Sequence, residues 1–180
     1  TEPGNGLHAL GKVSKSSRER DLVAILHDGD RPLEELTNYL FDKLKPNTAA
    51  VFMVDNTRES VWLRKWKSAG DHLDICHPIP LRDSIFAWPY NQKKNLYIPD
   101  VKSPDVLQYY TEPPPVRSLL CSPVTVDEEV AGFIVLDSLE RDAFESQQDS
   151  LMGLGRAYAA HAVRTLKSMQ YIHQEGIVFS

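Results

Sequence analysis

The chain has 180 residues, which is the length of one domain and enough to bury a sizeable core. Hydrophobic residues make up 42% of it and charged residues 25%, as in ordinary globular proteins, and no segment approaches the roughly 20 consecutive apolar residues that cross a bilayer. The net charge of −5 includes no block of like charge, so the composition gives no reason to expect a nucleic-acid partner.

The first part of the chain predicts a tail followed by two helices. Residues 1–14 are rich in Gly and Ser and have little pattern, which is typical of a flexible tail, and 16–27 predict a short helix that Gly29 ends. A second helix begins at Asp30 as its N-cap, with Pro32 in the first turn. Its apolar residues fall at helical spacing and form one buried stripe: Leu33, Leu36, Leu40, Phe41 and Leu44.

Three strands are predicted next. The continuous apolar run 49–54 is short enough for a central strand, and 61–68 is its expected antiparallel partner after a turn. Residues 73–79 predict a third strand. These segments indicate the first half of an antiparallel sheet.

Residues 80–115 are the irregular part of the chain. Ser84 is placed to cap a short helix that Pro89 stops, and 96–98 predict a short strand. Long proline-rich excursions inside a compact domain are more often functional loops than accidents. We therefore expect this segment to carry part of the functional site.

The last part predicts two strands and a long helix. Residues 119–126 and 130–136 are apolar nearly throughout, as in central strands covered on both faces. A helix opens at Glu145 or Ser146 and runs to about Gln174. The predicted fold class is therefore α+β, a central antiparallel sheet with the terminal helices on one face and the irregular segment on the other.

One domain is predicted over 15–174, between tails at 1–14 and 175–180. The start of the chain shows no signal-peptide pattern. Cys76 and Cys121 belong to no CxxC or Cys/His cluster, so we expect no metal site and two reduced thiols. Together these features indicate a cytoplasmic location, with no membrane contact from this segment.

Three further segments carry motifs whose order and intervals are informative. The first joins SIFAW at 84–88 to LYIPDV at 96–101, the second is VRSLLCSPV at 116–124, and the third is VAGFIVLDS at 130–138. They are similar to a short helix with an "l-x-I-x-D" strand, an "R-S-x-L-x-x-P" strand and an "x-x-G-v-l-x-l" strand of the GAF family. The resemblance covers roughly residues 30–166.

This resemblance implies a six-stranded antiparallel sheet, terminal helices that form a dimer face, and a ligand pocket on the opposite face. GAF domains are mostly sensory or regulatory inputs to histidine kinases, cyclic-dinucleotide enzymes, phosphodiesterases and transcription activators. The resemblance therefore implies a sensory or regulatory domain of a signal-transduction protein, with the output domain of the parent protein as a partner. A fold does not determine a function, so the site residues need their own argument.

By this analogy, a ligand pocket lies between the sheet and the segment 80–118. Apolar walls with a few polar tips are typical of small-molecule sites, although aromatic rings also fill cores beneath long loops. Arg117 is placed either to pair with an anionic ligand group or to tie the loop to the sheet, and both interpretations stay open. The candidate ligand-binding residues are Trp88, Tyr90, Tyr97, Tyr109, Tyr110, Arg117 and Cys121.

The terminal helices are the candidate homodimer interface. The last helix carries small residues that allow close helix approach, and paired helices can pass a shift to an output domain. Packing against the domain's own sheet is the alternative, and it would occupy other faces of the same helices. The candidate interface residues are Leu22, Ile25, Leu154, Tyr158, His161 and Thr165.

The motifs argue against three cofactors found in this family. Cyclic-nucleotide-binding members carry an Asn-Lys, a Phe and an Asp-Glu pair, whereas Asn95 follows a lysine and Phe144 precedes no Asp-Glu pair. Bilin-carrying members use a Cys-His pair in a helix on the pocket side, but Cys76-His77 lies earlier, in a predicted strand. Haem needs an axial histidine, and His161 has the commoner interior or interface position on a helix. The ligand therefore has no assigned identity.

Catalysis has one precedent in the family, the free methionine sulfoxide reductases, which work through a cluster of cysteines. Such a reaction needs an attacking thiolate and a resolving thiol. Only Cys76 and Cys121 are available for redox chemistry, outside the family's spacing, and no Ser/His/Asp set, carboxylate pair or phosphate-binding Gly loop is visible. We therefore expect the domain not to be an enzyme.

Two hypotheses remain. The first is a ligand-sensing input domain, in which a small molecule in the pocket biases the helices of a dimer because it binds two states with different affinities. The second is a structural dimerisation or protein-interaction module with no ligand.

Overall fold

The computed structural model describes residues 30–145, 149, 153 and 155–166. Helical residues 30–44 come first, and helical residues 153 and 155–166 come last. We call these two helices the helix pair. The elements between them are β1 (Thr48–Val54), β2 (Ser60–Ser68), β3 (Ile79–Pro80), α2 (Ala87–Gln92), β4 (Leu96–Ile98), a short 3-10 helix η1 (Pro104–Val106), β5 (Ser118–Val126) and β6 (Glu129–Ser138).

Six strands form one antiparallel sheet in the order β3-β2-β1-β6-β5-β4. Strands β5 and β6 are the apolar runs of the sequence: β6 is buried at every residue except Glu129, and β5 exposes only Thr125. The predicted α+β class and its antiparallel sheet are confirmed.

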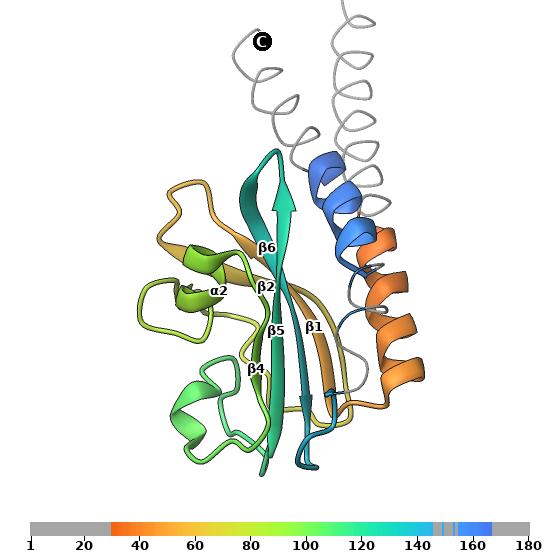
Figure 1. The fold of residues 1–180 in the computed structure, drawn as a ribbon, viewed down its shortest axis with the longest axis vertical. Coiled ribbons are helices and arrows are strands. Elements are labelled where there is room, and N and C mark those ends of the chain that lie inside the picture. The colour runs from red at the N-terminus through yellow and green to blue at the C-terminus, as the bar shows by residue number, and fades with distance from the viewer. Residues whose placement is uncertain (1–29, 146–148, 150–152, 154, 167–180) are drawn as a thin grey trace, which may run out of the picture.

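The sheet is the middle layer of three (Figure 1). The helix pair lies side by side on one face, which we call the helix face, and α2 with its flanking loops lies on the other, which we call the loop face. Successive side chains of β1 point to opposite faces of the sheet: Ala49 and Val51 point to the helix face, whereas Ala50 and Phe52 point to the loop face. Each face therefore has its own hydrophobic core.

Aromatic rings fill the core of the loop face. Phe86, which precedes α2, lies with its ring centroid 4.9 Å from that of Phe52 and 4.9 Å from that of Phe133, in tilted geometry. Tyr109 stands at 72° to Phe52, with 5.8 Å between the centroids. All four rings are fully buried, so α2 and the loops are fastened to the sheet mainly by aromatic packing.

A bulge explains why the alternation along β2 is irregular in the sequence. The β1–β2 register shifts between Val51 and Phe52, so Trp62 lies opposite Met53 on the helix face while Trp66 lies opposite Ala50 on the loop face. Two residues four apart in a regular strand would share one face. The bulge therefore puts the two tryptophans on opposite sides of the sheet.

The third predicted strand is wrong over most of its length. Only Ile79–Pro80 pair with β2. Before them, Asp74 Oδ1 accepts hydrogen bonds from the backbone N–H groups of Cys76 and His77, at 3.0 and 3.2 Å. This Asx-type turn supplies a local alternative to strand pairing, so the chain bends there.

The predicted role of Pro89 is also wrong. Pro89 is the third residue of α2, which runs on to Gln92 and ends where Lys93 adopts a left-handed φ of 54°. Proline is tolerated in a first helical turn because the N–H groups there have no intrahelical acceptor.

Some predictions lie outside the described residues: the tails 1–14 and 175–180, the helix 16–27, and the end of the last helix. No helix within the described ranges is both long and apolar enough to cross a membrane.

Candidate functional site

The loop face brings four of the predicted ligand-binding residues together. Tyr109, Tyr110 and Cys121 belong to its buried core, and Tyr90 of α2 packs against that core while half-buried. The space between the sheet and the segment 80–118 is therefore occupied by the protein's own side chains.

The other three predicted residues lie elsewhere. Trp88 is on α2 with 47% of its surface exposed. Tyr97 pairs with Leu120 across β4 and β5 and packs on the core of the helix face, because its position in the strand turns it away from the loops. Tyr97 therefore does not line the space beneath the segment 80–118.

Arg117 has a partner inside the protein. Its Nη2 donates to Asp100 Oδ1 at 2.8 Å, while its backbone N–H donates to Ser138 at 2.7 Å. Lys102, then Arg117, lower the pKa of Asp100 to about 2, with Arg141 3.2 Å from the same carboxylate. These contacts support the interpretation in which Arg117 ties the loop to the sheet.

A buried carboxylate is the main polar feature of the loop face. Both Tyr109 and Tyr110 donate their hydroxyl protons to Asp137 Oδ2, each at 2.7 Å. Asn47 Nδ2 lies 3.4 Å from Asp137 Oδ1, and the Thr48 hydroxyl lies 2.7 Å from that of Tyr110. We call these five residues the Asp137 cluster, and it ties the loop around residue 110 to β1 and β6.

Burial governs the ionisation of the Asp137 cluster. Burial raises the pKa of Asp137, and the hydrogen bonds from Tyr109 and Tyr110 partly oppose that rise. The same burial, followed by the Asp137 charge, raises the pKa of both tyrosines. The hydroxyls therefore stay protonated and act as donors. Sequence reasoning missed Asp137, although a lone acidic residue near the end of an otherwise apolar strand was a usable signal.

Polar contacts at two hairpin tips hold α2 over the loop face. Arg58 Nη1, in the β1–β2 turn, donates to the Tyr90 hydroxyl at 3.2 Å, and its Nη2 pairs with Glu129. Lys93 Nζ donates to the Glu128 carbonyl in the β5–β6 turn. The Arg58 and Glu129 side chains are 35% and 67% exposed, so this ion pair contributes little.

The two cysteines have different environments. Cys76 is exposed in the loop before β3, whereas Cys121 is fully buried in β5 and burial raises the pKa of its thiol. Over the described ranges, no group of three His, Cys, Asp or Glu side chains is arranged to hold a metal ion.

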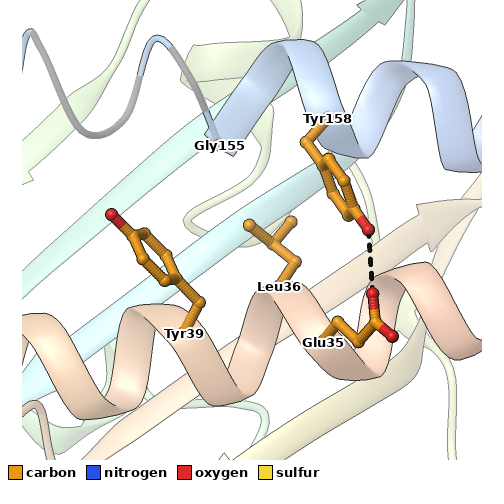
Figure 2. Close-up of a pocket in the computed structure, with 5 residues that line it drawn as sticks. All are labelled: Glu35, Leu36, Tyr39, Gly155 and Tyr158. Atoms are coloured by element: carbon orange, nitrogen blue, oxygen red, sulfur yellow. Dashed lines mark hydrogen bonds between the residues drawn. The ribbon is translucent and has the colours of Figure 1, made fainter.

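The helix pair carries a groove on its outer surface. It has a volume of about 460 Å³ and is lined by Glu35, Leu36, Tyr39, Gly155 and Tyr158. Figure 2 shows Leu36 between the two tyrosines, with the Tyr158 hydroxyl donating to Glu35 Oε2 at 3.1 Å. Tyr39 is 45% exposed and Tyr158 is 44% exposed. Sequence reasoning missed Glu35 and Tyr39, since only the packed pair of helices makes them neighbours of Tyr158.

The last helix has separate inner and outer sides. Ala159, Ala162 and Leu166 are buried against the core of the helix face. Three predicted interface residues, Tyr158, His161 and Thr165, are exposed or half-buried on the other side. The other three, Leu22, Ile25 and Leu154, lie outside the described residues.

Known proteins share this fold. The GAF domain model matches residues 30–163, and no curated protein sequence matches the chain. The GAF domain of an Acinetobacter phosphoenolpyruvate-protein phosphotransferase superimposes with a TM-score of 0.67 at 14% identity, over 84% of this chain and 95% of that one. The type II free methionine-R-sulfoxide reductase of Thermoplasma acidophilum superimposes with a TM-score of 0.65 at 19% identity, over 79% of this chain and 96% of that one. The free methionine-R-sulfoxide reductase of Neisseria meningitidis, in complex with its substrate, superimposes with a TM-score of 0.64 at 15% identity, over 82% of this chain and 86% of that one.

These comparisons correct the expectation that the domain is not an enzyme. Two of the three similar structures are enzymes built on this fold, at identities of 19% and 15%. The same fold thus carries catalysis in some proteins and regulation in others, and the absence of a familiar catalytic motif was too weak a ground for excluding catalysis.

Proposed function

Since the chain belongs to the GAF domain family, a sensory and regulatory fold of signalling proteins, we propose that it is a regulatory input domain that works as a homodimer through its helix pair. The observation that carries this proposal is the groove on the outer surface of the helix pair, between the half-exposed rings of Tyr39 and Tyr158. Exposed aromatic side chains around an apolar depression are typical of protein interfaces.

The proposed partner at this surface is a second copy of the chain. In a twofold dimer one patch meets itself, so each tyrosine can face the groove of the other copy. Leu36 and Gly155 form an apolar floor, and a Cβ at Gly155 would come within 3.7 Å of Leu36 and Ile134, so the small residue lets the two helices of this chain pack closely beneath the groove. The proposed interface is therefore self-complementary.

The same helices connect the interface to the sheet. Their inner sides pack on β1, β5 and β6, so a shift in the sheet moves the outer side as well. Asn95, which precedes β4, accepts hydrogen bonds through Oδ1 from Ser122 at 2.6 Å and from Arg156 Nη1 of the last helix at 3.1 Å. This contact supports coupling between the α2–β4 connection and the last helix.

Hydrogen–deuterium exchange at several protein concentrations tests the proposal. Amides of residues 35–39 and 155–158 should exchange more slowly as the concentration rises, whereas those of α2 should not change. Exchange at the helix pair that is independent of concentration would overturn the proposed interface.

Small-molecule sensing at the loop face is a second candidate, and the carboxylate of Asp137 buried within that face favours it. The polar contacts of Arg58 and Lys93 lie near the surface and contribute little, so the aromatic packing around Phe86 is what a ligand would have to displace. A molecule entering there would have to move the ring of Phe86 or Tyr109 and would then lie close to Asp137.

A single-tryptophan variant tests this second candidate. Trp62→Phe with Trp66→Phe leaves Trp88 on α2 as the reporter, and both replaced residues are exposed. The variant is titrated with amino acids, organic acids and nucleotides while emission and melting temperature are recorded. A ligand at one hundred times its Kd should shift the emission and stabilise the fold by about 2.7 kcal/mol. If none changes either signal, sensing at this face is refuted.

A further inference from the structure

The outer edge of β2 is open along most of its length. β3 pairs with β2 only at Ser60 and Val61. Within the described part of the chain, no backbone hydrogen bond reaches the outer edge of residues 62–68. In an antiparallel sheet the N–H and C=O groups of alternate residues point to each side, so this edge presents free donors and acceptors.

Two half-exposed tryptophans stand along this edge. Trp62 is 45% exposed on the helix face and Trp66 is 41% exposed on the loop face, because the bulge in the β1–β2 pairing turns them to opposite sides. An added strand would therefore meet an aromatic ring on both of its faces. Cross-strand contacts with aromatic residues stabilise such pairs.

A groove adjoins the edge on the loop face. It has a volume of about 280 Å³ and lies between the end of β2 and the loop that follows, with Ile75 58% exposed on one side. Strand addition commonly combines main-chain hydrogen bonds with a pocket for alternate side chains. The residues that line this groove are Trp66, Lys67, Ser68, Gly70, Asp71, Leu73 and Ile75.

Charge distinguishes the possible occupants. β2 carries Arg64, Lys65 and Lys67 and no acidic residue. Arg64 pairs with Asp30 at 2.8 Å and Lys67 with Asp42 at 3.4 Å, whereas no ion pair within the described ranges involves Lys65. A second β2 beside the first would oppose basic residues to basic residues, which is unfavourable. An acidic strand would instead meet a complementary edge.

We propose that the edge of β2 at residues 62–68 binds an extended acidic segment of another protein by strand addition, with an apolar side chain of that segment in the groove beside Trp66. The residues that line the groove of the helix pair differ from those that line the groove beside β2, although Arg64 and Lys67 of β2 pair with Asp30 and Asp42 of the helix of residues 30–44.

A labelled peptide tests the proposal. The probe is a capped heptapeptide of alternating glutamate and valine with a central phenylalanine, titrated with the full chain by fluorescence anisotropy. One matched peptide has lysine in place of each glutamate, and another is N-methylated at alternate amides and cannot donate their hydrogen bonds. The protein variants are Lys65→Glu and Trp66→Ala, with Lys43→Glu as the control because Lys43 is exposed on the helix of residues 30–44.

The acidic peptide should bind, and the lysine and N-methylated peptides should bind at least about tenfold more weakly. Lys65→Glu should weaken the acidic peptide by about tenfold, because it replaces an attraction with a repulsion, whereas Lys43→Glu should not. The proposal is overturned if the acidic peptide fails to bind at millimolar concentration, if all peptides bind alike, or if Lys65→Glu behaves as Lys43→Glu does. Should Trp66→Ala not fold, Lys65→Glu and the N-methylated peptide still decide the question.

Discussion

Tyr109→Phe removes one hydroxyl from the Asp137 cluster and leaves the ring in place. The Tyr109 ring is fully buried and keeps its contacts with Phe52, so packing changes little. What is lost is the 2.7 Å hydrogen bond to Asp137 Oδ2, while Tyr110 continues to donate to the same oxygen. The variant therefore isolates a single hydrogen bond to a buried carboxylate.

The magnitude depends on whether Asp137 is ionised. A hydrogen bond to a charged group contributes about 1.5–3 kcal/mol, and one between neutral groups about 1 kcal/mol. Because burial raises the folded-state pKa of Asp137 above its ordinary value of 3.8, this group's stabilising contribution is complete below that value. It is lost as the pH rises through the folded-state pKa. The hydrogen bond from Tyr109 lowers the folded-state pKa of Asp137, so its removal raises that pKa further and increases the stability that is lost at high pH.

Urea unfolding at a series of pH values measures the effect. Tyr109→Phe should lower the free energy of unfolding by about 1 kcal/mol near pH 4 and by about 2 kcal/mol near pH 8. Tyr90→Phe is the matched control, because the Tyr90 hydroxyl meets Arg58 and not Asp137, and its effect should not vary in this way. A loss for Tyr109→Phe below about 0.5 kcal/mol, or one independent of pH, would refute the described role of the Asp137 cluster.

Two other substitutions test the sheet and the loop attachment. Gly132→Ala would place a Cβ against a carbonyl oxygen of β1 and should destabilise the fold by about 1–3 kcal/mol in a thermal melt, whereas Gly70→Ala, which meets nothing within 4 Å, should change it little. Equal effects of the two would contradict the packing of β6 on β1. Lys102 and then Arg117 lower the Asp100 pKa to about 2, so this carboxylate contributes stability above pH 3.8 that is lost as the pH falls toward 2. Arg117→Ala should therefore flatten the stability–pH curve between pH 4 and 2, and an unchanged curve would argue against the ion pair.

The strands were predictable where burial is uniform. β5 and β6 follow continuous apolar runs, and the structure extends them by only a residue or two beyond 119–126 and 130–136. A continuous apolar run predicts a central strand without reference to the neighbouring strands, because such a strand is covered on both faces. β2 was less regular in the sequence, since its bulge depends on the register with β1.

The site was harder to predict because long-range contacts create it. Asp137 became a functional candidate only when the fold brought Tyr109 and Tyr110 to the end of β6. Tyr97 was assigned to the loop face, but the register of β4 turns it to the helix face. The groove of the helix pair joins Tyr39 to Tyr158, and no local pattern reveals that contact.

Sedimentation velocity of the full chain across a concentration series tests the central claim, homodimerisation through the helix pair, most directly. The wild type should be a dimer, and Tyr39→Ala combined with Tyr158→Ala should be a monomer with an unchanged circular dichroism spectrum. Trp88→Ala is the control, because Trp88 is comparably exposed but lies on α2, and it should remain dimeric. A monomeric wild type, or a dimer that both tyrosine substitutions leave intact, would refute homodimerisation through the helix pair.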